Sequence, residues 1–240
     1  MILSVHQPQY LPWLGYFDKV AASELFVFLD LPQYKKREFQ NRNRIKGSNG
    51  EVWLTVPVVS KGKFEQPIKD VEIDNSQDWQ KSHWQGIELN YKKAPFWAPL
   101  APKLKPFYEK RWDRLCELNL EMDVFFFKEL GIATPWKLES SIGTSTASTE
   151  RLIELCQKTG GTHYLSGSGG KDYMDEALFA RQGLGLSYQH YQHPEYRQQW
   201  PKLGFLPYMS VLDLLFNEGP QSLAVLRGAQ APAGAEGGRA

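Results

Sequence analysis

The sequence has few cysteines and almost no net charge. Only two cysteines, Cys116 and Cys156, occur among 240 residues, and their separation rules out a CxxC motif. A disulfide framework or a zinc knuckle is therefore not expected. The 28 Lys and Arg residues nearly balance the 27 Asp and Glu residues, which gives a formal net charge of +1. No general field would attract nucleic acid or an anionic membrane, so we expect a small-molecule substrate and no nucleic-acid partner.

Long apolar runs and several common enzyme motifs are also missing. No run approaches the ~18 residues of a membrane span, and the chain reaches His6 before an apolar signal segment could be completed. We therefore expect a cytoplasmic protein with no membrane span. The sequence contains no Walker loop, no HExxH helix and no Gly-x-Ser-x-Gly elbow. These absences argue against P-loop enzymes, zincins and the common hydrolases.

What the sequence does contain is an alternation of strand-like and helix-like segments. Short apolar runs at residues 2–6 and 25–30 are typical of buried strands, and residues 14–23 between them have helical spacing. The same alternation returns later, with strands expected at residues 136–142, 162–166 and 186–191 and helices expected at 149–159 and 173–182. This pattern predicts an α/β fold with a mostly parallel, doubly wound sheet in a single domain of residues 1–227.

The middle of the chain departs from this alternation. Residues 34–46 are polar and basic and are expected to form a loop, and a strand is expected at 52–59. Prolines interrupt the helical spacing of residues 76–131, which predicts several helices that form an insertion or a cap.

The last part of the chain contains one further helix and then a tail. A helix is expected at residues 211–216, with Ser210 as its N-cap and Gly219 after its end. Gly, Ala and Pro dominate residues 228–240, which predicts a disordered tail without a role in the site.

The loop after the first strand is rich in polar and aromatic side chains. His6 stands at the end of this strand and Asp30 at the end of the next, and the carboxyl ends of parallel strands meet at one edge of a sheet. A strand-end histidine followed by a glycine near a helix N-terminus can bind phosphate. Alternatively, His6 only hydrogen-bonds within its own loop. The substrate-binding candidates of this loop are Gln7, Tyr10, Gly15 and Tyr16.

Two further polar segments are candidates for anion binding. Asn41, Arg42 and Asn43 supply amide and guanidinium donors suited to a carboxylate or a phosphate, although a solvated basic loop would look similar. The segment after the strand at 162–166 is rich in glycine and would form an anion-binding nest, or simply a strand-to-helix turn. Its candidate residues are Ser166, Gly167, Gly169, Gly170, Lys171 and Asp172.

A third candidate segment follows the last predicted strand. His193 and Tyr196 would shape an acceptor pocket, with His190 on the opposite face of the strand from His193. Adding His163 or Asp172 as a third ligand gives no recognisable zinc spacing, so no metal site is predicted.

Four motifs together resemble the WbqC-like family. They are HQPxYLPWxGYF at residues 6–17, NRNxIK at 41–46, YLSGxGGKDY at 164–173 and SVLDLLFNxG at 210–219. The likeness runs from residue 1 to about residue 220. This family is named from bacterial O-antigen gene clusters, and it has been proposed to transfer glycine to a surface sugar. The resemblance implies a transferase or ligase that joins an amino-acid group, such as glycyl, to a sugar-type acceptor in surface polysaccharide or related biosynthesis.

The first loop is also similar to the nucleotidylyl-transferase and pantothenate-synthetase group, in which two histidines and a glycine hold ATP phosphates. Here only His6 is present, because Tyr16 follows Gly15 where that group has its second histidine. This similarity implies a nucleotidylyl-transferase-like fold with ATP and magnesium as cofactors, and it makes Lys171 part of a second phosphate clamp. The hypothesis leaves the acyl donor, the acceptor and the oligomeric state open.

In this hypothesis, cations and a histidine stabilise phosphate charge while another group takes the acceptor's proton. The catalytic candidates are His6 and Lys171, with His193 or Asp30 as the general base. We expect His6, Asn41, Arg42, Lys171 and His193 to converge on one cleft. The alternative hypothesis is a nucleotide- or sugar-binding module without catalysis, because the second histidine is absent.

Overall fold

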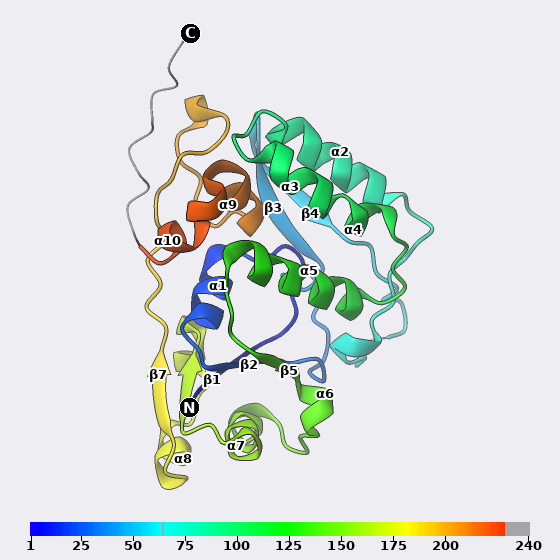
Figure 1. Cartoon of the computed structure of the whole chain (residues 1–240). Coiled ribbons are helices and arrows are strands. Elements are labelled where there is room, and N and C mark those ends of the chain that lie inside the picture. The colour runs from blue at the N-terminus through cyan, green and yellow to red at the C-terminus, as the bar shows by residue number, and fades with distance from the viewer. Residues whose placement is uncertain (64, 229–240) are drawn as a thin grey trace.

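The computed structural model describes residues 1–63 and 65–228, and its centre is a parallel β-sheet (Figure 1). The five strands are β1 (Ile2–His6), β2 (Leu25–Phe28), β5 (Trp136–Leu138), β6 (His163–Ser166) and β7 (Gly185–Tyr188). Their order across the sheet is β5-β2-β1-β6-β7, and every neighbouring pair is parallel. The predicted α/β class with a mostly parallel sheet is confirmed.

The strand order reverses next to β1. From β1 the chain adds β2 and β5 on one side, and it later adds β6 and β7 on the other. In open α/β sheets such a reversal leaves a crevice at the carboxyl ends of the two central strands. The pairing of Ile2 with His163 and of Leu3 with Tyr164 fixes the register of β1 and β6. Both strands therefore end at the same edge, with His6 on one and Ser166 on the other.

Alternate residues of the strands face two separate hydrophobic cores, as the two-residue period of a strand requires. Leu3, Val5 and Val27 belong to the smaller core. This core lies beneath α7 (Ser148–Thr159) and α8 (Glu176–Arg181), which cover one face of the sheet (Figure 1). Phe26 and Phe28 point into the larger core on the other face.

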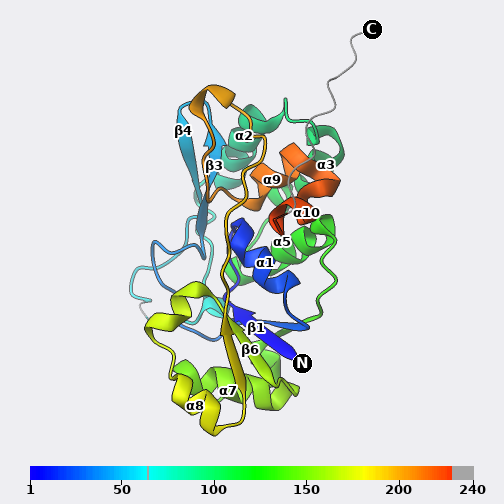
Figure 2. The ribbon, with the colours of Figure 1, turned by 90° about the vertical axis from the view of Figure 1, so that its left-hand side faces the viewer.

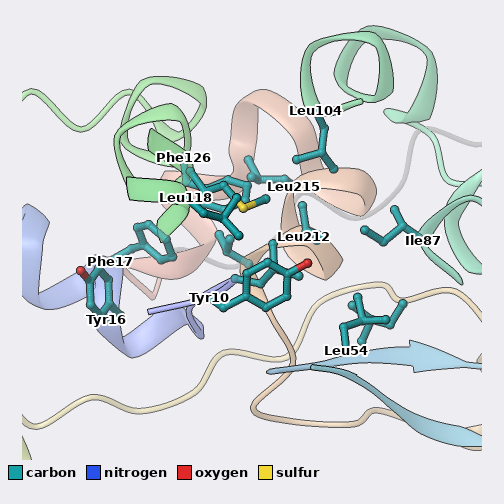
Figure 3. Packing of buried hydrophobic residues seen from close by; sticks show 14 of the residues in the cluster. Tyr10, Tyr16, Phe17, Leu54, Ile87, Leu104, Leu118, Phe126, Leu212 and Leu215 are labelled. Atoms are coloured by element: carbon teal, nitrogen blue, oxygen red, sulfur yellow. The ribbon is translucent and has the colours of Figure 1, made fainter. Parts of the chain in front are cut away.

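The larger core extends from the sheet into a helical half of the molecule. α1 (Leu14–Ala21) and α5 (Leu115–Leu130) cover the sheet, and the Phe127 ring of α5 lies 5.9 Å from that of Phe28. Figure 3 shows Tyr10 among side chains of this core, including Leu118 of α5 and Leu212 of α9. The remaining helices of this half are α2 (Trp79–Tyr91), α3 (Trp97–Leu104), α4 (Pro106–Glu109), α9 (Val211–Glu218) and α10 (Ser222–Leu226). The several helices predicted within residues 76–131 are confirmed.

One predicted loop contains a strand. Residues 34–46 were expected to be irregular, but β3 (Arg42–Gly47) pairs antiparallel with β4 (Gly50–Thr55). The prediction was wrong here because β3 buries polar side chains. Asn43 and Lys46 are fully buried and hydrogen-bonded, so the strand lacks the apolar alternation of its type.

Several predicted strands were too long. The strand expected at 52–59 ends at Thr55. The strand expected at 136–142 ends at Leu138, and α6 (Glu139–Ile142) follows, where the Ser140 amide donates a hydrogen bond to the Asp30 carboxylate at 2.9 Å. The strand expected at 186–191 ends at Tyr188. His190 and His193 therefore lie beyond it and not on its two faces.

The end of the chain agrees only in part with the prediction, because a second helix, α10 (Ser222–Leu226), follows the helix that was expected. The Ser210 hydroxyl accepts a hydrogen bond from the Leu212 amide at 3.3 Å, and Gly219 has a positive φ just after α9. The described part of the chain also contains short 3₁₀ turns, namely η1 (Ile68–Asp70), η2 (Ser168–Asp172), η3 (Pro201–Leu203) and η4 (Gly219–Gln221). The tail predicted at 228–240 lies, after its first residue, outside the described residues. Across the described ranges, no helix has the length and apolar character needed to cross a membrane.

Candidate functional site

A cavity of about 310 Å³ opens where the strand order reverses. Two segments from the predicted site form its walls, since His6 and Gln7 follow β1 while the glycine loop of residues 166–170 follows β6. The full lining consists of Val5, His6, Gln7, Lys19, Leu29, Leu152, Tyr164, Ser166, Gly167, Gly169, Gly170 and Tyr173. The first loop and the glycine loop thus face each other across a pocket, as a doubly wound sheet predicts.

His6 enters this cavity as a neutral imidazole. Burial, and to a lesser extent the nearby Lys19 ammonium, lower the pKa of His6 to about 3. Its Nδ1 lies 3.1 Å from the Gln7 carbonyl oxygen, which can only accept a hydrogen bond, so Nδ1 carries the proton. Nε2 is then an acceptor. At neutral pH His6 therefore adds no positive charge, and its free nitrogen suits a ligand hydroxyl or amine.

Gln7 is held by a residue that the sequence pattern did not indicate. The buried Gln40 donates a hydrogen bond from Nε2 to Gln7 Oε1 at 2.8 Å, while the Lys35 amide donates to Gln40 Oε1 at 3.1 Å. These two hydrogen bonds hold the Gln7 side chain in place, with its Oε1 bonded to Gln40. The Gln7 amide group at the cavity wall remains a donor for a ligand.

The glycine loop needs its small residues for close packing. A Cβ on Gly170 would lie 2.0 Å from Ser166 Oγ, so no side chain fits there. The buried Ser166 donates its hydroxyl to the Gly167 carbonyl at 3.1 Å. A Cβ on Gly167 would lie 3.8 Å from Lys19 Nζ, which is an ordinary contact distance. The backbone of this loop therefore forms the cavity wall directly.

The cation in the cavity wall is Lys19, which the sequence analysis missed. Lys19 belongs to α1 and is 4% exposed, and its ammonium donates to the Val5 carbonyl at 2.9 Å. Burial lowers the pKa of Lys19 to about 7. A usable signal existed in the sequence, because Lys19 follows Tyr16 by three residues and Gly15 by four. Helical spacing places these three residues on one side of a helix.

Tyr10, Gly15 and Tyr16 lie behind the cavity and not in its lining. The Tyr10 hydroxyl is buried with His83 Nδ1 at 2.8 Å and the Tyr108 hydroxyl at 3.0 Å. Tyr16 contacts His6 with its ring at 5.0 Å and donates its hydroxyl to a buried carboxylate, that of Asp123. Gly15 packs beneath the Trp13 indole. These residues support the first loop from within the core.

The predicted Asn and Arg cluster also binds protein atoms. Asn41 Nδ2 donates to the Val56 carbonyl at 2.8 Å, and Asn43 Nδ2 donates to the Leu11 carbonyl at 2.7 Å. Arg42 donates to the Arg37 carbonyl, and its guanidinium lies 4.9 Å from the centre of the Trp53 ring. Of these contacts, that of Asn43 joins the β3–β4 hairpin to the first loop. None of them lines the cavity.

The remaining candidates are dispersed. Lys171 is exposed, with Nζ 5.3 Å from the centre of the Tyr188 ring, and Asp172 is exposed beside it. His193 has both ring nitrogens engaged, since Nδ1 lies 2.9 Å from the Pro194 carbonyl and Nε2 accepts from the Tyr208 amide at 3.1 Å.

Tyr196 and Asp30 also have partners within the protein. Tyr196 donates its hydroxyl to the Asp213 carboxylate at 2.8 Å, and Asp30 caps α6. Neither residue lines the cavity. The convergence expected for His6, Asn41, Arg42, Lys171 and His193 is therefore wrong, because only His6 of this set reaches the cavity. Within the described part of the chain, no group of three or more His, Cys, Asp or Glu side chains is placed to hold a metal ion.

Comparison with known proteins places the chain in a known group. The model of the WbqC-like protein family matches residues 7–225. A protein of Mycobacterium tuberculosis named "Uncharacterized protein Rv1507c" is 40% identical over 231 residues, covering 94% of this chain and 97% of the relative. No solved structure matches the chain significantly. The likeness to a nucleotidylyl-transferase fold therefore stays a prediction.

Proposed function

Because this chain belongs to the WbqC-like protein family, we propose that it is a transferase or ligase that joins an amino-acid group, such as glycyl, to a sugar-type acceptor. Membership of this family suggests a biosynthetic enzyme. The observation that carries the proposal is the cavity at the strand reversal, where His6 and the glycine loop come together. Ligands of open α/β sheets bind at such a place.

In this proposal the protein contributes mainly positioning. The acceptor hydroxyl or amine binds His6 Nε2, whose partner Nδ1 is anchored on the Gln7 carbonyl. The acceptor then attacks the carbonyl carbon of an activated acyl donor, the donor's leaving group departs, and the acceptor's proton is released to water. With a pKa of about 3, His6 orients the acceptor through a hydrogen bond and does not keep its proton. The cavity of about 310 Å³ is at the small end of ligand pockets, which span roughly 300–1,000 Å³. It suits an aminoacyl group or the reactive part of a larger molecule.

ATP with magnesium is the proposed source of activation. The carboxylate of the amino acid would attack the α-phosphorus of ATP, giving an acyl-adenylate and pyrophosphate. Among the described residues that line the cavity there is no carboxylate, so magnesium would be carried by the nucleotide phosphates, as is common for this ion. A carrier-bound aminoacyl group would need no ATP.

A second candidate is a nucleotide- or sugar-binding module without catalysis. It is favoured by one observation: Lys171, His193 and Asp30, the proposed partners of His6, do not line the cavity. A binding module needs only the cavity and its hydrogen-bonding groups.

Ligand-dependent stabilisation tests these two candidates. Ligands that bind the folded state raise its melting temperature by mass action. A panel of glycine, other amino acids, ATP with magnesium, and nucleotide sugars should identify the ligands, and pyrophosphate release with ATP, glycine and a sugar acceptor should report turnover. Binding without turnover of any donor and acceptor pair would support the module. Stabilisation by nucleotide sugars alone would contradict activation by ATP.

His6→Ala should separate a site residue from a structural one. His6 lies at the end of a strand and lines the cavity, so its removal should leave the circular dichroism spectrum and melting temperature close to wild type while abolishing turnover. Lys171→Met is the control, because its exposed side chain does not line the cavity. A His6→Ala variant that unfolds, or that retains full turnover, would remove His6 from the mechanism.

A further inference from the structure

Lys19 is a buried cation with an incomplete set of partners. Its ammonium has three N–H donors, and the structure provides one acceptor, the Val5 carbonyl at 2.9 Å. Within residues 1–63 and 65–228, no carboxylate forms an ion pair with it. The nearby His6 is neutral and offers no negative charge. Buried charges in proteins are normally paired, so this arrangement lacks a counter-ion.

The missing partner has room on the cavity side. Lys19 lines the cavity, and Gly167 faces its ammonium with no side chain between them. Gly167 has φ −66° and ψ 160°, a conformation open to any residue, so the backbone does not require glycine there. The space above the ammonium therefore depends on the choice of glycine at this position.

The low pKa of Lys19 agrees with its burial beside the cavity. Burial is the cause of its shift to about 7, and a bound anion would return the pKa towards the ordinary value for lysine. An uncompensated ammonium destabilises the folded protein. Perturbed groups of this kind gather in functional clefts.

We propose that Lys19 is the oxyanion-binding residue of the cavity, holding a substrate carboxylate or phosphate between its ammonium and the backbone at Gly167. His6 Nε2 then faces the neutral part of the same ligand. This inference deepens the proposed function and rests on it for the chemistry of the substrate. Binding of an oxyanion requires no turnover, so the two can fail separately.

Calorimetric titration with simple oxyanions tests the assignment. Inorganic phosphate, pyrophosphate and glycine are the probes. The first two offer phosphate oxygens, and glycine offers a carboxylate next to its own ammonium. The wild-type protein should bind at least one probe saturably, and the preferred probe identifies the anion. Lys19→Met should weaken that binding at least tenfold, since it removes the charge and keeps an unbranched apolar side chain.

A second variant keeps the lysine and tests the geometry. Gly167→Ala adds a methyl group at an ordinary contact distance from Nζ, so the fold should persist while the space for the anion shrinks, and affinity should fall at least threefold. Gly86→Ala and Lys171→Met are controls for a glycine substitution and for a lost cation. Both lie outside the cavity lining and should bind like wild type.

The outcomes separate the two proposals. Three results would overturn the role of Lys19. They are unchanged affinity in Lys19→Met, loss of affinity in Lys171→Met, and no binding of any probe by the wild type. If Lys19 and Gly167 govern anion binding but no aminoacyl transfer is found, the oxyanion site stands and the transferase proposal fails. If transfer occurs and Lys19→Met transfers at the wild-type rate, the transferase stands and the oxyanion site fails.

Discussion

At the scale of single residues, two buried ionisable groups lie in contrasting surroundings. Lys19 faces a cavity, whereas Asp123 is enclosed by the larger core. Asp123 Oδ2 accepts hydrogen bonds from the Tyr16 hydroxyl at 3.1 Å and the Gln9 amide at 3.4 Å, and none of the described residues provides a partner for its Oδ1. Burial raises the pKa of Asp123 well above its usual value. The open side of Lys19 suits a ligand, and the enclosed Asp123 suits a structural role as a neutral acid.

Asp123→Asn should therefore stabilise the protein at neutral and alkaline pH. The pKa of Asp123 is higher in the folded state than in the unfolded state, so its stabilising contribution is complete at low pH and is lost as pH rises. Asparagine keeps an acceptor for Tyr16 and removes the ionisation, which should raise the free energy of unfolding at pH 8 and raise it less at pH 4. Thermal unfolding at both pH values measures this. A lower melting temperature at pH 8 would show that Asp123 is charged and compensated.

Lys19→Met should also be more stable than wild type. Its advantage should shrink as pH rises, whereas that of Asp123→Asn should grow. The pKa of Lys19 is about 7 in the folded state, below the unfolded value, so the charge penalty is largest below pH 7 and declines as pH rises towards the unfolded pKa. The advantage of methionine should shrink by about 2–3 kcal/mol between pH 6.5 and pH 9.5. Urea unfolding at the two pH values, without added phosphate, measures it. A constant difference would mean that Lys19 has an unperturbed pKa.

At the scale of elements, the sequence predicts strands by their apolar content and fails where a strand is held by polar contacts. The strands β1 and β2 were predicted because most of their residues are apolar. β3 was missed because its buried side chains include Asn43 and Lys46, whose partners, the Leu11 carbonyl and Gln198, come from distant parts of the chain. No local pattern reveals such partners.

The start of α1 was predicted, but the reason for its glycine was not. Gly15 was interpreted as part of a phosphate site, whereas a Cβ there would lie 2.2 Å from the Trp13 ring. Trp13 in turn contacts Tyr191 and Tyr208, with ring centres 5.4 Å and 5.7 Å away. The glycine therefore lets the first loop and the segment after β7 pack together on α1.

Gly15→Ala should destabilise the protein, although replacing a glycine inside a helix by alanine usually stabilises it. A methyl group would displace the rigid Trp13 indole, and such overpacking costs about 1–3 kcal/mol. Gly86→Ala in α2 is the matched control, because its nearest neighbour is a Leu54 methyl at 3.7 Å. It should gain about 0.5–1 kcal/mol from helix propensity. Thermal melts of both variants provide the comparison, and equal effects would exclude the packing explanation.

At the scale of the whole molecule, the sequence predicted where the cavity lies but not all of the residues that line it. Parallel strands that end at His6 and Ser166 had to meet at one edge, and they do. His193 could not be placed in this way, because the chain leaves the sheet at Tyr188. Figures 1 and 2 show that the segment after β7 runs along the molecule to the half that contains β3 and β4.

A buried carboxylate fastens this long segment to the helical half. Asp213 of α9 accepts hydrogen bonds from Tyr91 of α2 at 2.8 Å, from Tyr196 at 2.8 Å and from Gln198 Nε2 at 2.7 Å. Burial raises the pKa of Asp213 to about 6, and the three donors and Lys46 oppose the shift. Sequence reasoning assigned Tyr196 to an acceptor pocket, whereas the structure gives it a partner that joins two distant parts of the chain.

Asp213→Asn should weaken the whole fold without affecting the cavity. Three donors converge on the two carboxylate oxygens, and the amide nitrogen of asparagine must replace one of them, which leaves a buried donor without its acceptor and costs about 1–3 kcal/mol. Urea unfolding followed by circular dichroism and by tryptophan fluorescence should show one transition at a lower midpoint. Titration with the preferred oxyanion, well below that midpoint, should give wild-type affinity, because neither Asp213 nor its partners line the cavity. Reduced affinity with unchanged stability would instead place the segment around Tyr196 in the ligand site, as the sequence had suggested.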